Sequence, residues 1–149
     1  MNLAIRAPIA TDEAAWRALW SGYTHFYRVD LAEDVTAALW RKLITPGADI
    51  TGLVAERDGN LVGLAHVLFH PSTWSHDLGC YLEDLFVAPA ARGTHAAQAL
   101  IEAVAALAKS RGADRLYWHT QEFNAPARSL YDSLAQRTSF IVYRMPLSG

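Results

Sequence analysis

The sequence predicts a mixed α/β fold in a single domain of 149 residues. Two observations indicate this fold. Short runs rich in β-branched and aromatic residues alternate with longer runs whose apolar residues recur at helical spacing. Near the middle of the chain, an apolar strand breaks at Pro89, and an Arg92-Gly93 turn then opens a long amphipathic helix. The expected order of strands and helices is β-α-α-β-β-β-α-β-α-β.

The first third of the chain is expected to form one strand and two helices. Residues 3–6 are the strand. The first helix has one apolar face, made by residues at helical spacing: Trp16, Leu19, Trp20, Tyr23 and Phe26. The second helix begins near Ala32 and stops at Pro46-Gly47, because proline and glycine end helices.

A β-hairpin is expected next. Two strand-like runs, at about 50–57 and 61–69, are joined by Asp58-Gly59-Asn60, a strong turn signal. The remaining elements are expected in this order: a loop at 70–79, a strand at 80–88, a helix near 94–111 ended by Gly112, a strand at 116–119, a helix at 125–135 and a last strand at 140–145.

The composition excludes several classes of protein. Apolar residues make up 52% of the chain and charged residues 19%, as in a globular protein with a sizeable core. The formal charge of −2 argues against a nucleic-acid partner held by bulk electrostatics. The N-terminal region lacks a basic stretch before an apolar run, and no apolar segment is long enough to span a membrane. We therefore expect a soluble, cytoplasmic protein without a nucleic-acid or membrane partner.

Cysteine and histidine residues give no sign of a metal site. The single cysteine, Cys80, excludes an intrachain disulfide and a thiolate zinc site, and we expect it to be a small core residue. His66 and His70 share one face of a predicted strand but lie too far apart for easy chelation. We therefore predict that the protein binds no metal.

The segment YLEDLFVAPAARGTHAA, residues 81–97, predicts an anion-binding site. A strand that passes through an Arg-Gly turn into a helix presents unpaired N–H groups at the helix N-terminus. The helix dipole adds positive potential at the same point. Such a turn is suited to a pyrophosphate group.

Three features of the chain together resemble the GNAT N-acetyltransferase superfamily. The sequence YLEDLFVAPAARG resembles the acetyl-CoA strand and pyrophosphate loop of that family, usually written Q/R-x-x-G-x-G/A. NAPARSLYDSL at 124–134 resembles its N-x-x-A-x-x-L-Y helix, and the order of elements matches over nearly the whole chain. The resemblance implies acetyl-CoA as cofactor and a GNAT fold, in which a mixed, mostly antiparallel sheet of six to seven strands is flanked by four helices. The similarity is greatest to a branch with small-molecule and polyamine acetyltransferases and histone acetyltransferase relatives.

The same resemblance assigns the cofactor contacts. The pantetheine arm is expected to lie beside the strand and to bond its main chain around Leu85, Phe86 and Val87, and a strand N–H is expected to polarise the thioester carbonyl. The diphosphate is expected to take N–H groups from these residues: Arg92, Gly93, Thr94, His95, Ala96 and Ala97. Asn124 matches an Asn that contacts the cofactor arm, and it also suits the N-cap of the following helix.

The loop departs from the family pattern at two positions. His95 stands where the family prefers glycine, so a side chain narrows the approach of a phosphate to the backbone. The imidazole could instead point away, or carry a partial positive charge that assists the phosphates. Ala90 occupies the first Q/R position, which removes a polar contact.

Acetylation of an amine requires a proton acceptor and a proton donor. An alkylammonium has a pKa near 10, so at neutral pH only about one molecule in a thousand is a nucleophile. Tyr131 matches the tyrosine to which the family assigns proton donation to the thiolate; alternatively it packs under the sheet. Glu83 is the candidate base, directly or through a water, and Asp84 is the alternate, with strand alternation placing them on opposite faces. The other interpretation of either carboxylate is purely structural.

The acceptor pocket is expected to involve the first two helices and the loop before the cofactor strand, here 20–34 and 70–79. Candidate substrate-binding residues are Tyr23, Tyr27, Trp74 and His119. Acidic residues could contact a cationic amine: Asp30, Glu33, Asp34 and Asp77. The aromatic residues could equally fill a core, and His119 could be a surface histidine.

Three functions follow from these patterns as hypotheses. The first is an acetyl-CoA-dependent N-acetyltransferase that acts on a small primary amine by direct transfer in a ternary complex. The second has a protein lysine or N-terminal amine as acceptor, and the third is an acyl-CoA-binding module without catalysis. A homodimer is also possible, in which the apolar last strand contributes an edge.

Overall fold

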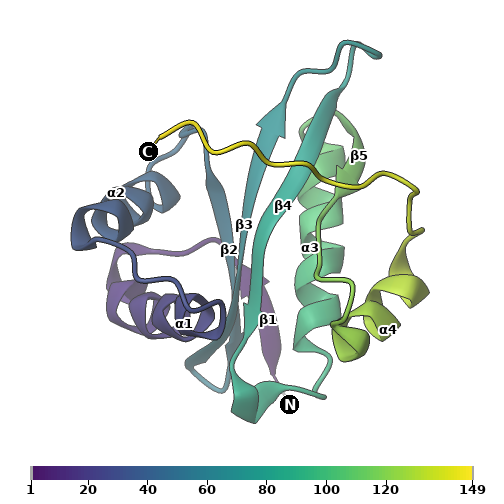
Figure 1. The fold of residues 1–149 in the computed structure, drawn as a ribbon. Coiled ribbons are helices and arrows are strands. Elements are labelled where there is room, and N and C mark those ends of the chain that lie inside the picture. The colour runs from purple at the N-terminus through teal and green to yellow at the C-terminus, as the bar shows by residue number, and fades with distance from the viewer. Residues whose placement is uncertain (1, 149) are drawn as a thin grey trace. The chain divides into compact units, whose positions relative to one another are not determined.

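The computed structural model describes residues 2–148, which form two compact units that divide between His119 and Thr120. The first unit contains a five-stranded sheet with three α-helices, and the second contains one α-helix (Figure 1). The elements of the first unit are β1 (Leu3–Arg6), α1 (Glu13–Phe26), α2 (Glu33–Leu43), β2 (Thr51–Arg57), β3 (Asn60–His70), β4 (Leu78–Val87), α3 (Ala96–Ser110) and β5 (Ala113–Tyr117). Short 3-10 helices cover Ala10–Asp12 and Pro89–Ala91.

The sheet has the strand order β1-β2-β3-β4-β5. Its neighbours pair in antiparallel fashion except β4 and β5, which are parallel, so the sheet is mixed and mostly antiparallel as predicted. The expected number of six to seven strands is wrong, because the structure has five between residues 2 and 148. Helices α1 and α2 cover one face of this sheet and α3 covers the other (Figure 1).

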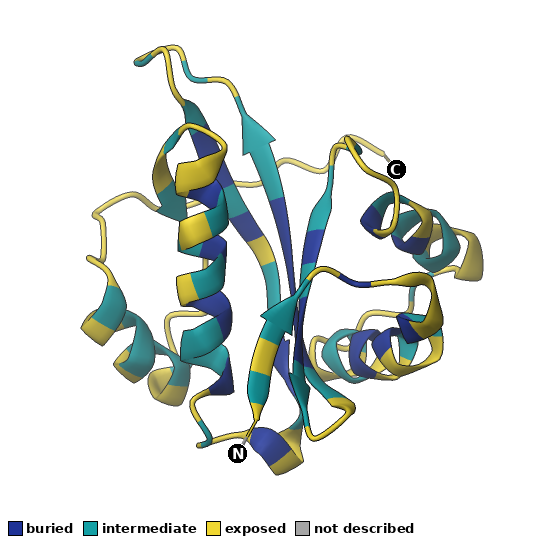
Figure 2. Ribbon diagram, turned by 180° about the vertical axis from the view of Figure 1, so that it is seen from behind, coloured by how far each residue is buried: buried dark blue, intermediate teal, exposed yellow. Residues whose placement is uncertain are grey.

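A cluster of three tryptophans forms the core between the sheet and helices α1 and α2. Trp16 is fully buried, with ring centroids 5.9 Å from Trp20 and 5.1 Å from Trp40. The helical spacing of Trp16 and Trp20 gives α1 one apolar face, and Leu64 of β3 packs against it. Figure 2 shows buried residues on the inward sides of the helices and along the central strands.

The hairpin predicted at Asp58-Gly59 is confirmed. Both residues have positive φ angles, 51° and 83°, which the tight turn between two antiparallel strands requires. Helix α3 begins at Ala96, two residues later than expected, because Thr94 and His95 belong to the turn before it. Gly112 follows the helix with φ 81°, as expected for the residue that ends it.

A β-bulge interrupts the pairing of β4 with β3. His66 pairs with Asp84, whereas the next residue, Val67, pairs with Leu82, so Glu83 is an extra residue on β4. Consecutive residues of a strand point to opposite faces, and paired residues point to the same face. Asp84 therefore lies on the face of His66, and Leu82 lies on the opposite face. The bulge thus breaks the alternation that was expected across this strand.

Strands β4 and β5 separate after a short paired stretch. Their parallel pairing begins at Leu78 with Ala113 and ends at Tyr81 with Tyr117. Beyond that pair, the β5 side of β4 from Leu82 to Val87 has no neighbouring strand among the described residues. This edge keeps main-chain donors and acceptors available for another extended group.

The second unit contains α4 (Ala125–Leu134) and an irregular segment after it. The strand expected at 140–145 is wrong, because these residues form no ladder with any strand. A strand is stabilised by hydrogen bonds to a neighbouring strand, and no ladder among the described residues includes this segment. Its large apolar side chains are exposed: Phe140, Ile141, Val142, Tyr143, Met145 and Leu147. Between residues 2 and 148, no helix is both long and apolar enough to cross a membrane.

Asp12 links the first strand to the start of α1, and we expect its removal to destabilise the fold. Its carboxylate accepts hydrogen bonds from Arg6 at 2.7 and 3.0 Å and from the Ile9 N–H at 2.8 Å. Leaving these donors without a partner in Asp12→Ala is expected to lower the free energy of unfolding by about 1–3 kcal/mol. Urea denaturation measures this loss.

The pH dependence gives a second test of Asp12. The hydrogen bond from Arg6 lowers the pKa of Asp12 below its ordinary value of 3.8. A lowered folded-state pKa stabilises the fold above the unfolded-state value, and this stability is lost as the pH falls below about 4. Asp12→Asn keeps an acceptor for Ile9 but should show a flatter stability profile in this range. An unchanged profile would show that the carboxylate contributes nothing through its charge.

Candidate active site

Two adjacent carboxylates, Glu83 and Asp84, mark the candidate site at the bulge of β4. Both carry negative charge toward Tyr23 of α1 and Tyr81 of β4, since both raise the pKa of each phenol. The alternation expected along this strand is interrupted between Glu83 and Asp84, because Asp84 lies on the face opposite to Leu82. The bulge places two carboxylates near the same aromatic residues, where a uniform strand would present one.

Asp84 is the end of a hydrogen-bonded triad with His66 and Trp16. Its Oδ2 lies 2.9 Å from His66 Nδ1, and the Trp16 indole N–H donates to His66 Nε2 over 3.1 Å. Trp16 is 0% exposed and His66 1% exposed. The carboxylate thus has a buried partner behind it. This triad was not predicted, because its members are separated by 50 and 18 residues in the sequence.

Glu83 is the more exposed of the two carboxylates and has the environment of a proton acceptor. Although the residue as a whole is exposed, its carboxyl group is partly desolvated by the surrounding protein. This partial burial and the charge of Asp84 raise the pKa of Glu83 above its ordinary value. A charge on His66 would act in the opposite direction and lower it. A carboxylate with a raised pKa accepts a proton more readily at neutral pH, which suits a general base.

Tyr23 forms the wall of the site that faces the two carboxylates. Burial, the charge of Asp84 and a hydrogen bond to Asp84 raise the pKa of Tyr23 well above 10, so its hydroxyl stays protonated. Its ring centroid lies 6.0 Å from that of Phe86 and 5.0 Å from that of Tyr27, and both contacts are edge-on. Tyr23 and Tyr27 were both predicted substrate-binding residues; Tyr23 interacts with Asp84, and Tyr27 packs against Tyr23.

An aromatic cluster lies where β4 and β5 separate. The rings of Tyr81 and Tyr117 stack at 5.1 Å, and the Tyr81 hydroxyl lies 3.2 Å from His119 Nδ1. His70 Nε2 lies 2.8 Å from the Tyr117 hydroxyl. His119 was a predicted site residue, whereas Tyr81 and Tyr117 were missed. A signal for Tyr117 was available, because strand alternation puts it two residues before His119.

The predicted residue Trp74 lies away from these groups. It is 92% exposed in the loop between β3 and β4, and its backbone N–H is bonded to Ser72 Oγ at 3.0 Å.

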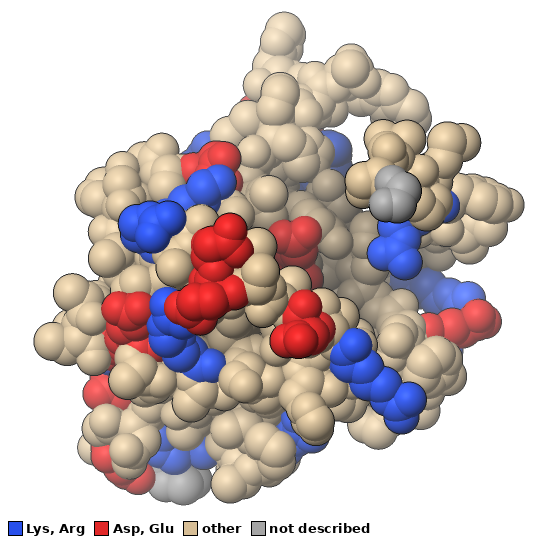
Figure 3. Space-filling view, turned by 60° about the vertical axis from the view of Figure 1, so that its left-hand side comes forward, with Lys and Arg blue, Asp and Glu red and all other residues tan. Residues whose placement is uncertain are grey.

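Figure 3 shows acidic side chains grouped on the face of the molecule that carries α1 and α2.

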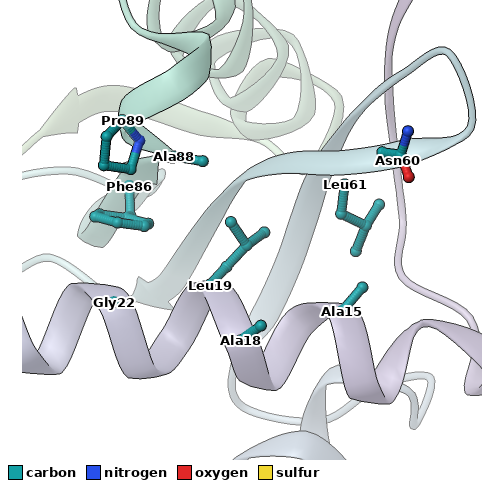
Figure 4. A pocket seen from close by; sticks show the side chains of 9 residues that line it. All are labelled: Ala15, Ala18, Leu19, Gly22, Asn60, Leu61, Phe86, Ala88 and Pro89. Atoms are coloured by element: carbon teal, nitrogen blue, oxygen red, sulfur yellow. The ribbon is translucent and has the colours of Figure 1, made fainter.

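An apolar cavity of about 370 Å³ lies between α1 and the ends of β3 and β4. Figure 4 shows Leu19, Leu61 and Phe86 between these elements. The other lining residues are Ala15, Ala18, Gly22, Asn60, Ala88 and Pro89. Phe86 lines this cavity, and its ring also makes an edge-on contact with Tyr23. Phe86 thus connects the cavity to the site of the two carboxylates.

The turn before α3 could hold an anion. Gly93 and His95 both have φ in the left-handed region, at 77° and 75°. Arg57 holds the turn through hydrogen bonds to Thr94 Oγ1 at 2.8 Å and Thr94 O at 3.1 Å, a role that the sequence did not suggest. Arg92 is exposed, and its Nε donates to Val87 O at 3.2 Å. The first N–H groups of the 15-residue α3 have no partners within the helix, so they are available to a diphosphate.

His95 occupies a backbone conformation that favours glycine, and we expect His95→Gly to stabilise the protein. A non-glycine residue in the left-handed region costs about 1–2 kcal/mol, and part of this cost is regained on substitution. The expected gain in the free energy of unfolding is about 0.5–1 kcal/mol, measured by urea denaturation. His95→Ala is the control, because it keeps the Cβ and should give no gain. A larger gain from alanine than from glycine would contradict this account.

The remaining predicted residues lie in the second unit. Asn124 takes the N-cap position of α4, where its backbone oxygen accepts the Arg128 N–H at 3.0 Å, but its side chain makes no capping bond. Tyr131 lies within α4.

Cys80 is buried as predicted, and burial raises the pKa of its thiol to about 11, which disfavours a reactive thiolate. No three potential metal-ligating side chains lie together between residues 2 and 148.

Comparison with known proteins places the chain among acetyltransferases. The model of the acetyltransferase (GNAT) family matches residues 13–135. The D-amino-acid N-acetyltransferase HPA3 of Saccharomyces cerevisiae is 30% identical over 145 residues, which cover 96% of this chain and 90% of HPA3. The uncharacterised N-acetyltransferase YhfO of Bacillus subtilis is 32% identical over 142 residues, covering 93% and 94% of the two chains.

Solved structures show the same fold. AAC(6')-Iy, bound to the bisubstrate analogue CoA-S-monomethyl-acetylneamine, matches with a TM-score of 0.85 and 19% identity, over 99% of this chain and all of that one. A ribosomal-protein-alanine N-acetyltransferase of Brucella melitensis matches with a TM-score of 0.83 and 21% identity, over 98% and 100%. The chain belongs to the acetyltransferase (GNAT) family, whose acyl donor is acetyl-CoA.

Proposed function

We propose that the protein transfers an acetyl group from acetyl-CoA to a primary amine of a small molecule, by direct attack in a ternary complex. The observation that carries this proposal is the pair of carboxylates at the β4 bulge, flanked by Tyr23 and Tyr81. Carboxylates and aromatic faces together attract an alkylammonium. The base must then remove a proton from that group before it can react.

The residues of the first unit fit acetyl-CoA, which supplies an acetyl group activated as a thioester. Among the described residues, no strand lies on the β5 side of β4 at Leu85, Phe86 and Val87, so the amides of the pantetheine arm can take that place. The turn from Arg92 to Ala97 offers backbone N–H groups to the diphosphate. We assign Gly93, Thr94, His95 and Ala96 to the same contact, and Asn124 to the cofactor arm.

Glu83 is proposed to take the proton from the ammonium group of the acceptor. Its raised pKa, caused by burial and by Asp84, narrows the gap to the pKa of the amine. Its exposure leaves the carboxylate accessible to a substrate or to a bridging water. Asp84 is less suited to this role, because its Oδ2 is already paired with His66.

Tyr131 is proposed to be the proton donor. A tyrosine phenol ordinarily has a pKa near 10 and a thiol one near 8.5, so a tyrosine can protonate a departing thiolate without a large energetic cost. The position of Tyr131 in the Asn124-to-Tyr131 motif supports this assignment.

Tyr23 is the proposed substrate-binding residue in contact with Asp84, and Tyr27 and His119 extend the same surface.

The relatives favour a small-molecule acceptor. HPA3 is named for D-amino acids, and AAC(6')-Iy was solved with the bisubstrate analogue CoA-S-monomethyl-acetylneamine. The Brucella relative is named for a ribosomal protein, so a protein amine is the alternative. Formation of free CoA should therefore be followed with a panel of D-amino acids, polyamines and aminoglycosides, beside a peptide array. Turnover with small amines supports the proposal; turnover confined to peptides, or CoA binding without turnover, contradicts it.

A further inference from the structure

The hydrogen-bond pattern fixes the protonation of the Trp16–His66–Asp84 triad. An indole N–H can only donate, so the Nε2 of His66 that receives it at 3.1 Å must carry no hydrogen. The ring hydrogen therefore sits on Nδ1 and is donated to Asp84 Oδ2 at 2.9 Å. His66 is thus held as one neutral tautomer, and Asp84 is held as the acceptor.

The same pattern resists a second proton on His66. Protonation of Nε2 would direct two N–H groups at each other, and Trp16 is packed too tightly among Trp20 and Trp40 to turn away. A neutral imidazole leaves the negative charge of Asp84 uncancelled. The side chain of Asp84 is only 14% exposed, so solvent screens that charge weakly.

We propose that Trp16 and His66 are positioning residues that hold Asp84 as a fixed anion beside Glu83, and that this anion keeps Glu83 able to accept the proton of the acceptor amine. The inference rests on the proposed role of Glu83 as base. It assigns different roles to Asp84 and Glu83, whereas the sequence left open which of the two is the base.

The groups around Glu83 are consistent with this division of roles. Asp84 raises the pKa of Glu83 after burial does, and a charged His66 would lower it. Tyr23 of α1 and Tyr81 of β4 face both carboxylates and are uncharged, because burial and the carboxylates raise the pKa of each phenol. The charge state of His66 therefore decides whether the negative charge of Asp84 acts on Glu83 without being cancelled.

The test is the pH profile of kcat/KM in two variants. In Trp16→Phe, His66 Nε2 loses its donor and can bind a proton as the pH falls, which neutralises Asp84. In Asp84→Asn the anion is absent. Both variants are expected to shift the acid limb of the profile to lower pH by roughly 0.5–1 unit.

Trp20→Phe is the matched control for the lost bulk of an indole. Trp20 belongs to the same core cluster and stacks on Trp16, but its Nε1 has no hydrogen-bond partner. Its acid limb should stay at the wild-type position. A limb that moves equally in Trp20→Phe, or does not move in Trp16→Phe and Asp84→Asn, overturns the inference.

Two further measurements separate failure of this inference from failure of the proposed function. If Glu83→Gln keeps a wild-type acid limb, Glu83 is not the base and this inference falls with that role; the proposed function itself falls only if small amines are not turned over. If Glu83→Gln abolishes the limb while the other variants leave it in place, only the inference falls. Nitrogen-15 NMR of His66 in the wild-type protein needs no activity: the expected signal at neutral pH is the neutral Nδ1–H tautomer, and an Nε2–H tautomer or an imidazolium contradicts the triad.

Discussion

Glu83→Gln is expected to lower kcat/KM for the best amine substrate by about 10²–10⁴-fold. The amide keeps the size of the side chain but cannot accept the proton of an ammonium group. Because the pKa of Glu83 is raised by burial and by Asp84, wild-type activity should fall as the pH drops through that raised value. The variant should lose this acid limb, as measured by initial rates between pH 5 and 9.

Glu102→Gln is the matched control for this substitution. Glu102 lies on the exposed side of α3, so the same change there removes a charge without touching β4. Its kcat/KM and acid limb should equal those of the wild type. If Glu83→Gln retained activity within threefold, the carboxylate would be structural and the base would have to be sought elsewhere.

Ala97→Glu is expected to weaken acetyl-CoA binding without weakening the fold. Ala97 lies in the first turn of α3, where a negative charge interacts favourably with the helix dipole. The same charge repels a diphosphate bound to those N–H groups. We expect the Kd for acetyl-CoA to rise roughly tenfold to a hundredfold, measured by isothermal titration, while Tm stays the same or increases.

Ala97→Gln separates charge from size in that experiment. It adds the same number of side-chain heavy atoms but no charge, so the rise in Kd should be much smaller. The repulsion in Ala97→Glu should also diminish with added salt, because salt screens an exposed charge. Equal losses of affinity in both variants would mean that the side chain blocks the site or that the diphosphate lies elsewhere.

Local sequence signals predicted much of the first unit. The Asp58-Gly59 turn and the apolar face of α1 depend on neighbouring residues, and both form as expected. The turn from Pro89 into α3 is of the same kind. Such features are set by backbone preferences and helical periodicity, which a single sequence displays directly.

Features that depend on tertiary pairing were missed. The bulge at Glu83 adds one residue to β4 without any glycine or proline to mark it, so alternation gave the wrong faces. The Trp16–His66–Asp84 triad joins three elements and leaves no sequence pattern. The segment 140–145 has strong β propensity, yet it forms no strand because a strand needs a partner.

The most direct test of the account is an initial-rate study that varies acetyl-CoA and the best amine from the panel together. Direct transfer in a ternary complex predicts double-reciprocal lines that intersect. The buried Cys80 thiol, with a pKa raised to about 11, is consistent with a reaction that forms no acetylated cysteine. Parallel lines would indicate a covalent acetyl-enzyme and contradict the roles given to Glu83 and Tyr131, and binding of acetyl-CoA without turnover would contradict catalysis itself.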